Sequence, residues 1–372
     1  MTSKYITPGV QSSIGLAAVP EFVHENWGID VDHVQENASH TGRVFIMGSV
    51  ATQEAVPTPF YDDMTEAETA DWERFVLKAF PDSITFKQLR LAHELSKVLN
   101  TASIQIDGAD ERIAVQSYLP TIASSRAGDQ NAVVAWHENG AEAVSNPAIL
   151  ARFVPGARLG SDISPAATSR MAELHAKVHG HFRDPALLRL AEADDSLKIT
   201  NTQGYMDRFT RQTPQILGQM PEIWKDILRV ADTAFPKLPQ GVVPTSFWMG
   251  DVMFKGDRPS GLVDINETEY TSPLLCLGMS LWGLYAAKGG DIEPVMQYVA
   301  TYQQHRELSP YEQQLWPHFM LARAIMCWQG AKLVEPLTTP GEKSAAQGDE
   351  ERIIKLSADL RERQLIPLWA KL

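Results

Sequence analysis

The sequence predicts an α+β protein with two lobes, a small α/β lobe over residues 1–120 and a larger, mostly helical lobe over residues 121–372. Three observations support this prediction. The chain has 372 residues, which is enough for two packed lobes. Helix and strand patterns are mixed up to about residue 120. Beyond about residue 125 most segments have helical spacing, and only "GLVD" at residues 261–264 is clearly a strand pattern.

The N-terminal elements begin with a short helix. "VPEFVHENW" (Val19–Trp27) has helical spacing and is followed by Gly28, a typical helix end. An extended segment is expected at Asp30–Val34. "GRVFIMGSV" (Gly42–Val50) is an apolar, β-rich run between glycines, and it predicts a strand.

The rest of the small lobe is expected to contain two helices and a hairpin. Thr65 provides a capping signal before a helix, and Lys78 falls within this helical pattern. A second amphipathic helix is predicted at Leu89–Leu99. The segment Ser103–Pro120 predicts a β-hairpin that turns at Asp107-Gly108.

The larger lobe is expected to be built from long helices. "SRMAELHAKVH" (Ser169–His179) has apolar residues at i, i+3 and i+7, and Tyr285–Gln304 and Glu312–Trp328 have similar patterns. A polar loop at Pro336–Glu351 precedes a last helix.

Composition excludes several classes of protein. The net charge is -13 and there is no run of Lys or Arg, so a nucleic-acid partner is not expected. The two cysteines, Cys276 and Cys327, lie in apolar stretches and are expected to be free buried thiols. No segment approaches the roughly 18 apolar residues of a membrane span, and the first residues lack the apolar run of a signal peptide. A cytoplasmic protein without membrane contact is expected.

The most specific pattern is "VMFKGDRPSGLVD" (Val252–Asp264). It resembles the strand-turn-strand segment of the aminoglycoside phosphotransferase/choline kinase superfamily, and most closely that of homoserine kinase type II proteins. Further segments resemble the same proteins in the same order, and together they cover well over half of the chain: "QENAS" (Gln35–Ser39), "SYLP" (Ser117–Pro120), "MAELHA" (Met171–Ala176) and Tyr298–Trp328.

The resemblance implies a protein-kinase-like fold that holds ATP and Mg²⁺ between its lobes. It also implies phosphoryl transfer to a hydroxyl of a small metabolite, such as an amino acid or amino alcohol. Asp264, at the end of the hairpin, would be a metal ligand. Tyr118 and Leu119, at the junction of the lobes, would bind the nucleotide.

The catalytic loop departs from the family pattern, which reads His-x-Asp and then, after five residues, Asn. Without gaps, "LPQGVVPTSFWMGD" (Leu238–Asp251) places Ser246 at the catalytic Asp and Asp251 at the Asn. The loop is therefore degenerate, because a hydroxyl is not a base at neutral pH. A second alignment puts Asp251 on the catalytic Asp but deletes the Asn-bearing turn. In both alignments Asp251 and Asp264 form a carboxylate pair that can bind Mg²⁺.

Two other family positions are altered. Cys276 stands where the family has an Asp that braces the catalytic loop. Met47 stands at the nucleotide-binding position where the strand at residues 42–50 would carry a phosphate-holding lysine. Lys87 lies only seven residues before Glu94, which is too close for it to replace that lysine. No GxGxxG loop precedes the strand.

The resemblance places the acceptor pocket beside Asp264. Asn266, Glu267 and Glu269 of "DINETEY" would recognise an ammonium or hydroxyl group there, although a solvated acidic loop explains them equally well. Trp248 would lie inside the catalytic loop, where it fills the altered site, stacks on a ligand or packs in the core.

The segment "HAKVHGH" contains three histidines, His175, His179 and His181. Two histidines at i and i+4 can share a metal on one helix face. No glutamate completes an HExxH pattern, so structural histidines are favoured.

Two functional interpretations remain open. In the first, the chain is a diverged small-molecule phosphotransferase, as the retained Asp251 and Asp264 suggest. In the second, it is a pseudokinase, a binding or regulatory protein without catalysis, as the changes at Ser246, Cys276 and Met47 suggest. Altered transferase chemistry on the same scaffold is a third possibility.

Overall fold

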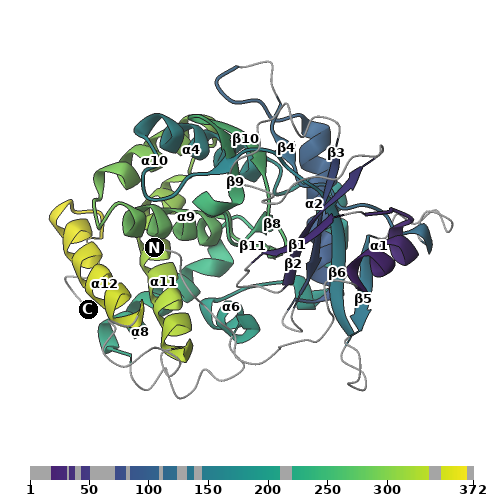
Figure 1. Ribbon diagram of the computed structural model, residues 1–372. Helices are drawn as coiled ribbons and strands as arrows, with labels where there is room; N and C mark the ends of the chain where they lie inside the picture. The colour runs from purple at the N-terminus through teal and green to yellow at the C-terminus, as the bar shows by residue number, and fades with distance from the viewer. Residues whose placement is uncertain are drawn as a thin grey trace. The chain divides into compact units, whose positions relative to one another are not determined.

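The computed structural model describes residues 18–31, 33–37, 43–50, 72–80, 84–108, 112–123, 132–137, 145–209, 220–334 and 345–366. These residues form two compact units that interleave along the chain (Figure 1). The smaller unit contains the described residues up to His93 together with those between Gln116 and Phe153. The larger unit contains residues 94–115 and the described residues from Val154 onward. The predicted boundary of lobes at residue 120 stays a prediction.

The smaller unit is built on a five-stranded sheet in the order β1-β2-β3-β6-β5. All neighbouring strands are antiparallel, and β3 is central. The strands are β1 (His33–Asn37), β2 (Arg43–Val50), β3 (Trp72–Ala79), β5 (Val133–His137) and β6 (Ser145–Arg152). The strand predicted at residues 42–50 is confirmed as β2.

A helix packs on each face of this sheet. Helix α1 (Val19–Trp27) is the predicted helix, and it ends at Gly28, whose φ of 69° is left-handed. Its apolar face joins one side of the sheet in a cluster that includes Val19, Val23, Trp27, Phe45, Met47, Phe75, Leu77 and Leu150. The start of α2 (Phe86–Ala102) packs on the other side in a cluster that includes Leu89, Ala92, Tyr118, Val133, Ile149 and Ala151.

The prediction of a helix around Lys78 was wrong, because this segment is the central strand β3. A strand that is buried on both faces has an apolar run without the alternation that identifies a half-exposed strand. Pairing with β2 and β6, which is not visible locally, decides the conformation. The capping signal at Thr65 lies outside the described residues.

Two more sequence expectations need correction. The strands β5 and β6 follow residue 125, where the sequence analysis found strand pattern only in "GLVD". The turn at Asp107-Gly108 is confirmed, with φ values of 56° and 65°. In the described residues of the predicted hairpin, the strand pairing is an isolated antiparallel bridge between Gln105 and Arg112.

The larger unit is mostly helical (Figure 1). Helix α11 packs against α8, α9 and α12, and α10 packs against α4. Its helices, besides the end of α2, are α4 (Pro165–Gly180), α5 (Pro185–Glu192), α6 (Thr202–Phe209), α8 (Glu222–Ala234), α9 (Pro273–Ala287), α10 (Glu293–His305), α11 (Pro310–Val334) and α12 (Ala345–Glu362).

The single helix predicted at Tyr285–Gln304 is divided between α9 and α10. Gly289 and Gly290, with φ values of 66° and 84°, form the turn between them. In contrast, the helices predicted at residues 169–179 and 312–328 are confirmed within α4 and α11.

Two small sheets complete the larger unit. One has the order β4-β10-β9-β7, and the other pairs β11 with β8. The strands are β4 (Ala114–Val115), β7 (Ala157–Arg158), β8 (Gly241–Pro244), β9 (Val252–Lys255), β10 (Arg258–Leu262) and β11 (Thr268–Thr271). Strands β9 and β10 form the antiparallel hairpin expected from "VMFKGDRPSGLVD".

Two sequence-level expectations concern cysteines and membrane spans. Cys276 and Cys327 are both free thiols, and Cys276 is fully buried. None of the helices in the described part of the chain is long and apolar enough to cross a bilayer.

Candidate functional site

The open end of the β9–β10 hairpin carries two aspartates. Asp251 ends the short 3₁₀ helix η4 (Met249–Asp251) directly before β9, and Asp264 lies two residues beyond β10. The backbone N–H of Val263 donates to the carbonyl oxygen of Asp251 at 2.8 Å, which ties the two ends together. Both aspartates are partly exposed. The hairpin therefore brings two carboxylate-bearing residues that are 13 positions apart in sequence to the same end of one structure.

The backbone at Asp264 is unusual. Its φ of 60° is left-handed, a conformation that non-glycine residues rarely adopt and that is often found at functional sites. The buried Asn266 side chain donates a hydrogen bond from Nδ2 to Oδ1 of Asp264. This bond orients the Asp264 carboxylate, so Asn266 supports the aspartate from inside the protein.

Asp251 is held by the loop that precedes it. Its Oδ2 accepts from the backbone N–H of Trp248 at 3.0 Å, and its own N–H donates to the Trp248 carbonyl at 2.9 Å. The Trp248 ring lies against Gly283 of α9, where an added Cβ would be 1.9 Å from a ring carbon. Trp248 is thus fixed by packing on a helix, and its predicted role in substrate binding stays a prediction.

Glu267 has an altered acidity. Burial, followed by the nearby Asp264 carboxylate, raises its pKa, whereas Arg323 and the Ser246 hydroxyl, a hydrogen-bond partner, lower it. The net result is a pKa of about 7. Thr245 donates to the Glu267 carbonyl from its N–H at 2.7 Å and from its hydroxyl at 2.9 Å. The structure therefore joins two residues that the sequence analysis singled out separately, Ser246 and Glu267.

Arg323 is a buried cation that the sequence analysis did not single out. It lies on α11 with 2% exposure, and its guanidinium sits 4.1 Å from the centroid of the Tyr205 ring. Its Nη2 donates to the Thr245 carbonyl at 3.5 Å, and its Nε has no hydrogen-bond partner within the described residues. The sequence signal was an arginine inside the apolar run "MLARAIMCW".

Glu269 does not lie in an open loop. It is on β11, opposite Val243 of β8, and is 1% exposed. Its alternative reading as a solvated acidic residue is wrong, and its predicted role in acceptor binding stays a prediction.

The loop between β8 and η4 is anchored at Phe247. The Ser280 hydroxyl donates to the Phe247 carbonyl, and the Phe247 N–H donates to Cys276. The His175 ring stacks on the Phe247 ring with centroids 4.1 Å apart and an interplanar angle of 1°. Burial raises the pKa of the Cys276 thiol to about 12. Cys276 and Ser280 thus support the loop where the family resemblance implied an Asp.

The sequence matches the model of the phosphotransferase enzyme family over residues 54–312, more than half of the chain. The chain belongs to this family. The expectations for Asp251, Asp264 and Ser246 came from a comparison with the residue pattern of such phosphotransferases. A comparison of the sequence with curated proteins found no match.

Solved phosphotransferases share the fold. An aminoglycoside 2′-phosphotransferase in complex with GDP has a TM-score of 0.56 at 11% identity over 94% of this chain and 99% of its own. An amicoumacin kinase in complex with AMP-PNP and Ca²⁺ has a TM-score of 0.55 at 12% identity, over 94% of this chain and 95% of its own. A microcompartment-associated aminopropanol kinase has a TM-score of 0.54 at 12% identity, over 94% and 97%. The two-lobed protein-kinase-like fold is confirmed, whereas the closeness to homoserine kinases stays a prediction.

The smaller unit of this family member carries the predicted nucleotide-binding residues. Met47 is fully buried in the core beneath α1. Tyr118 is buried and stacks on His93, and Leu119 is bonded to β6 through its N–H and the Leu150 carbonyl at 2.8 Å. Their roles in nucleotide binding stay predictions.

Lys78, which the sequence pattern placed in a helix, is a buried lysine of the five-stranded sheet. It is 7% exposed and lies near the end of the central strand β3. Its pairing partner on β6 is Ile149, which belongs to the cluster on the α2 side of the sheet. Because directly paired residues of antiparallel strands share a face, the Lys78 side chain points to that side. Burial of a lysine is uncommon and calls for a specific function or partner.

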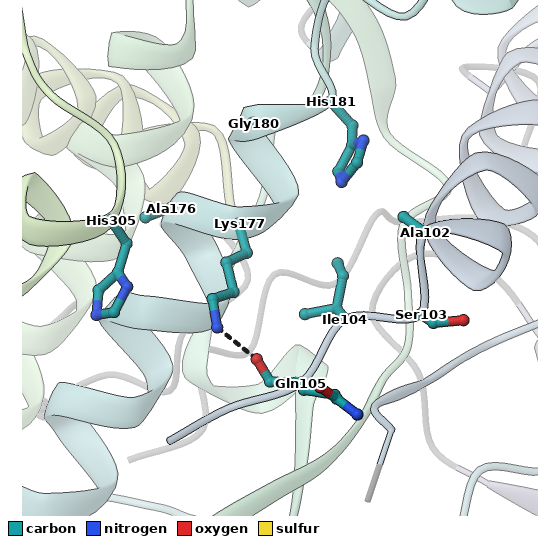
Figure 2. A pocket seen from close by; sticks show the side chains of 9 residues that line it. All are labelled: Ala102, Ser103, Ile104, Gln105, Ala176, Lys177, Gly180, His181 and His305. Atoms are coloured by element: carbon teal, nitrogen blue, oxygen red, sulfur yellow. Dashed lines mark hydrogen bonds between the residues drawn. The ribbon is translucent and has the colours of Figure 1, made fainter. Parts of the chain in front are cut away.

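An open pocket lies at a different part of the larger unit (Figure 2). Its lining includes residues 102–105, at and just beyond the end of α2, Lys177 of α4, His181 directly after α4, and His305 at the end of α10. Lys177 donates to the Gln105 carbonyl at 2.5 Å (Figure 2). It also donates to Glu173 at 2.6 Å. None of the predicted site residues lines this pocket. Of the three histidines of "HAKVHGH", His181 lines this pocket, whereas His175 and His179 are fully buried.

Proposed function

We propose that this protein transfers a phosphoryl group from Mg²⁺-ATP to a hydroxyl of a small amino-acid-like or amino-alcohol metabolite. The observation that carries the proposal is the pair Asp251 and Asp264 at one end of the β9–β10 hairpin, joined by the 2.8 Å bond from Val263 to Asp251. The amicoumacin kinase in complex with AMP-PNP and Ca²⁺ supports a nucleotide and a divalent metal. The aminopropanol kinase supports a small acceptor.

The residues present fit Mg²⁺. This ion prefers oxygen ligands, and it is commonly held by one or two carboxylates with water and phosphate oxygens completing the octahedron. Asp251 and Asp264 provide the carboxylates, and their partial exposure leaves room for the remaining ligands. Asn266 orients Asp264. When bound, Mg²⁺ neutralises negative charge on the nucleotide phosphates.

Lys78 is proposed to hold the nucleotide phosphates. In protein kinases this lysine is on the third strand of the N-terminal sheet. Lys78 lies on β3, the central strand of the five-stranded sheet, and is nearly fully buried. This assignment replaces the expected lysine position at Met47, which packs in the apolar core.

Glu267 is proposed to accept the proton of the acceptor hydroxyl. The acceptor oxygen attacks the γ-phosphorus, the bond to the β-phosphate oxygen breaks, ADP leaves, and the hydroxyl proton passes to the Glu267 carboxylate. Ser246, at the position of the usual catalytic Asp, is a hydrogen-bond partner of Glu267 and orients it. A pKa of about 7 suits a base that works near neutral pH.

The acceptor is proposed to carry an ammonium group. Asp251, Asp264 and Glu267 concentrate negative charge at this end of the hairpin, and a cationic acceptor complements it. Trp248, Asn266 and Glu269 keep their predicted substrate-binding roles, with Asn266 acting through Asp264.

A thermal-shift titration tests nucleotide binding. We expect ATP to raise the melting temperature of the wild type only when Mg²⁺ is present, and Asp264→Asn to abolish the shift. Asp257→Asn is the matched control, because Asp257 lies at the turn end of the same hairpin and is solvent-exposed. If ATP and GTP give no shift at concentrations well above the millimolar range, the kinase proposal is refuted.

Phosphoryl transfer is then measured as acceptor-dependent ADP release over a panel of hydroxylated amino acids and amino alcohols. A second candidate function, a binding protein without catalysis, is favoured by the serine at position 246. It predicts nucleotide or metabolite binding with no ADP release from any acceptor.

A further inference from the structure

A compact cluster of metal-ligand side chains lies beneath the loop that contains Phe247. His175 and His179 are one turn apart on α4, and Cys276 is on α9. All three are 0% exposed. The Nε2 atoms of the two histidines are 3.1 Å apart, and Nε2 of His175 is 3.2 Å from the Cys276 Sγ. The three ligand atoms lie within 4.8 Å of one another, so they converge on one point.

The other nitrogen of each histidine is held by a tyrosine of α10. Nδ1 of His175 is 2.9 Å from the Tyr298 hydroxyl, and Nδ1 of His179 is 2.7 Å from the Tyr302 hydroxyl. Metal-binding histidines almost always use their second nitrogen in this way, which fixes the ring and the tautomer. Both rings therefore present Nε2 to the centre of the cluster.

The donor set selects the kind of ion. Two imidazoles and one thiolate suit a borderline or soft cation such as Zn²⁺, and not Mg²⁺ or Ca²⁺, which prefer oxygen. Zn–N and Zn–S bonds of about 2.0 and 2.3 Å in a tetrahedron separate two nitrogens by about 3.3 Å, and a nitrogen from a sulfur by about 3.5 Å. The separations of 3.1 and 3.2 Å are only a few tenths of an ångström shorter.

The electrostatic setting is compatible with a cation. Arg306 is the nearby positive charge, and its guanidinium is paired with Glu312 at 2.8 Å. The Cys276 thiol releases its proton to solvent as the metal–sulfur bond forms, which offsets one of the two positive charges of the ion.

We propose that His175, His179 and Cys276 form a buried structural site for Zn²⁺ that fastens α4 to α9 beneath the loop between β8 and η4. The site is separate from the aspartate pair, which is proposed to hold the nucleotide's metal. The ion stabilises the support of Phe247, whose ring stacks on His175 and whose N–H donates to Cys276.

Co²⁺ substitution tests the site in the intact chain. The wild-type protein is unfolded, freed of metal with a chelator and refolded with one equivalent of Co²⁺ or Zn²⁺. We expect one Co²⁺ per chain, a thiolate-to-cobalt charge-transfer band in the near-ultraviolet, and a higher melting temperature with Zn²⁺ than without metal. This measurement uses only the wild-type protein, so it tests the proposal even if a substitution prevents folding.

Two cysteine variants locate the ion. Cys276→Ser is expected to lose the charge-transfer band and the bound zinc, whereas Cys327→Ser, which removes the only other thiol, is expected to keep both. The proposal is overturned if the refolded wild type binds no stoichiometric metal, which would leave a metal-free hydrogen-bonded cluster. It is also overturned if Cys276→Ser binds as much zinc as the wild type.

Discussion

Replacing Glu267 with glutamine is expected to stabilise the protein at alkaline pH. Burial and the Asp264 carboxylate raise the Glu267 pKa to about 7, against about 4.5 in an exposed glutamate. The unfolded chain therefore loses the proton first as the pH rises, and the folded state binds more protons between these two values. Its stability falls across this window and levels off above pH 7. The charged carboxylate is a net cost to folding, and the neutral glutamine removes it.

The size of the effect follows from the pKa difference. One pKa unit corresponds to about 1.4 kcal/mol, so a rise from about 4.5 to about 7 corresponds to about 3 kcal/mol of unfolding free energy above pH 7. At pH 4, where the carboxyl is protonated in both states, Glu267→Gln is expected to change stability by less than about 1 kcal/mol.

Urea unfolding of the wild type and Glu267→Gln at several pH values between 4 and 8 measures this difference. The effect of Glu267→Gln is also measured in the Asp264→Asn variant. This variant lacks the neighbouring negative charge, so the effect of Glu267→Gln on stability should be smaller there. A difference between wild type and variant that does not vary with pH would refute the electrostatic reasoning. If Glu267 is the proposed base, the stabilised variant is also expected to lose phosphoryl transfer while retaining nucleotide binding.

Three further substitutions test the nucleotide site and the loop. Lys78→Met is expected to lower the apparent affinity for ATP, obtained from the thermal-shift titration, at least tenfold. Lys87→Met, on the exposed part of α2, should leave this affinity unchanged. Gly283→Ala places a Cβ 1.9 Å from the Trp248 ring, so it should lower stability by about 1–3 kcal/mol and shift tryptophan fluorescence; unchanged values would exclude close packing there. Ser280→Ala removes the donor to a buried loop carbonyl and should cost about 1–3 kcal/mol in urea unfolding, and a neutral effect would show that the bond contributes little.

The sequence predicted those helices and strands whose conformation is determined by their own residues and not by distant contacts. Helix α1 has helical spacing and a terminal glycine, and β2 is a short apolar run between glycines. The β9–β10 hairpin is likewise local, and the sequence therefore placed Asp251 and Asp264 near each other. Strand β3 was missed because both of its faces are covered, and its conformation depends on β2 and on β6, which lies about 70 residues further along the chain.

The parts of the site that depend on distant contacts could not be predicted. Arg323 is 78 residues from Thr245, whose carbonyl it contacts, and no local pattern links the two. The raised pKa of Glu267 depends on burial, which only the fold determines. Cys276 was identified as a change at a family position, but its contact with His175, 101 residues away, required the structure.

The order of the five-stranded sheet has a practical consequence for dissecting the protein. Strand β6 lies between β3 and β5, yet both β5 and β6 follow residue 120 in sequence. A fragment that ends near residue 120 would keep β1, β2 and β3, and would turn the apolar central strand β3 into an unprotected edge. Such edges pair with other chains, so the fragment is expected to aggregate. A soluble fragment of the smaller unit has to include residues through Phe153.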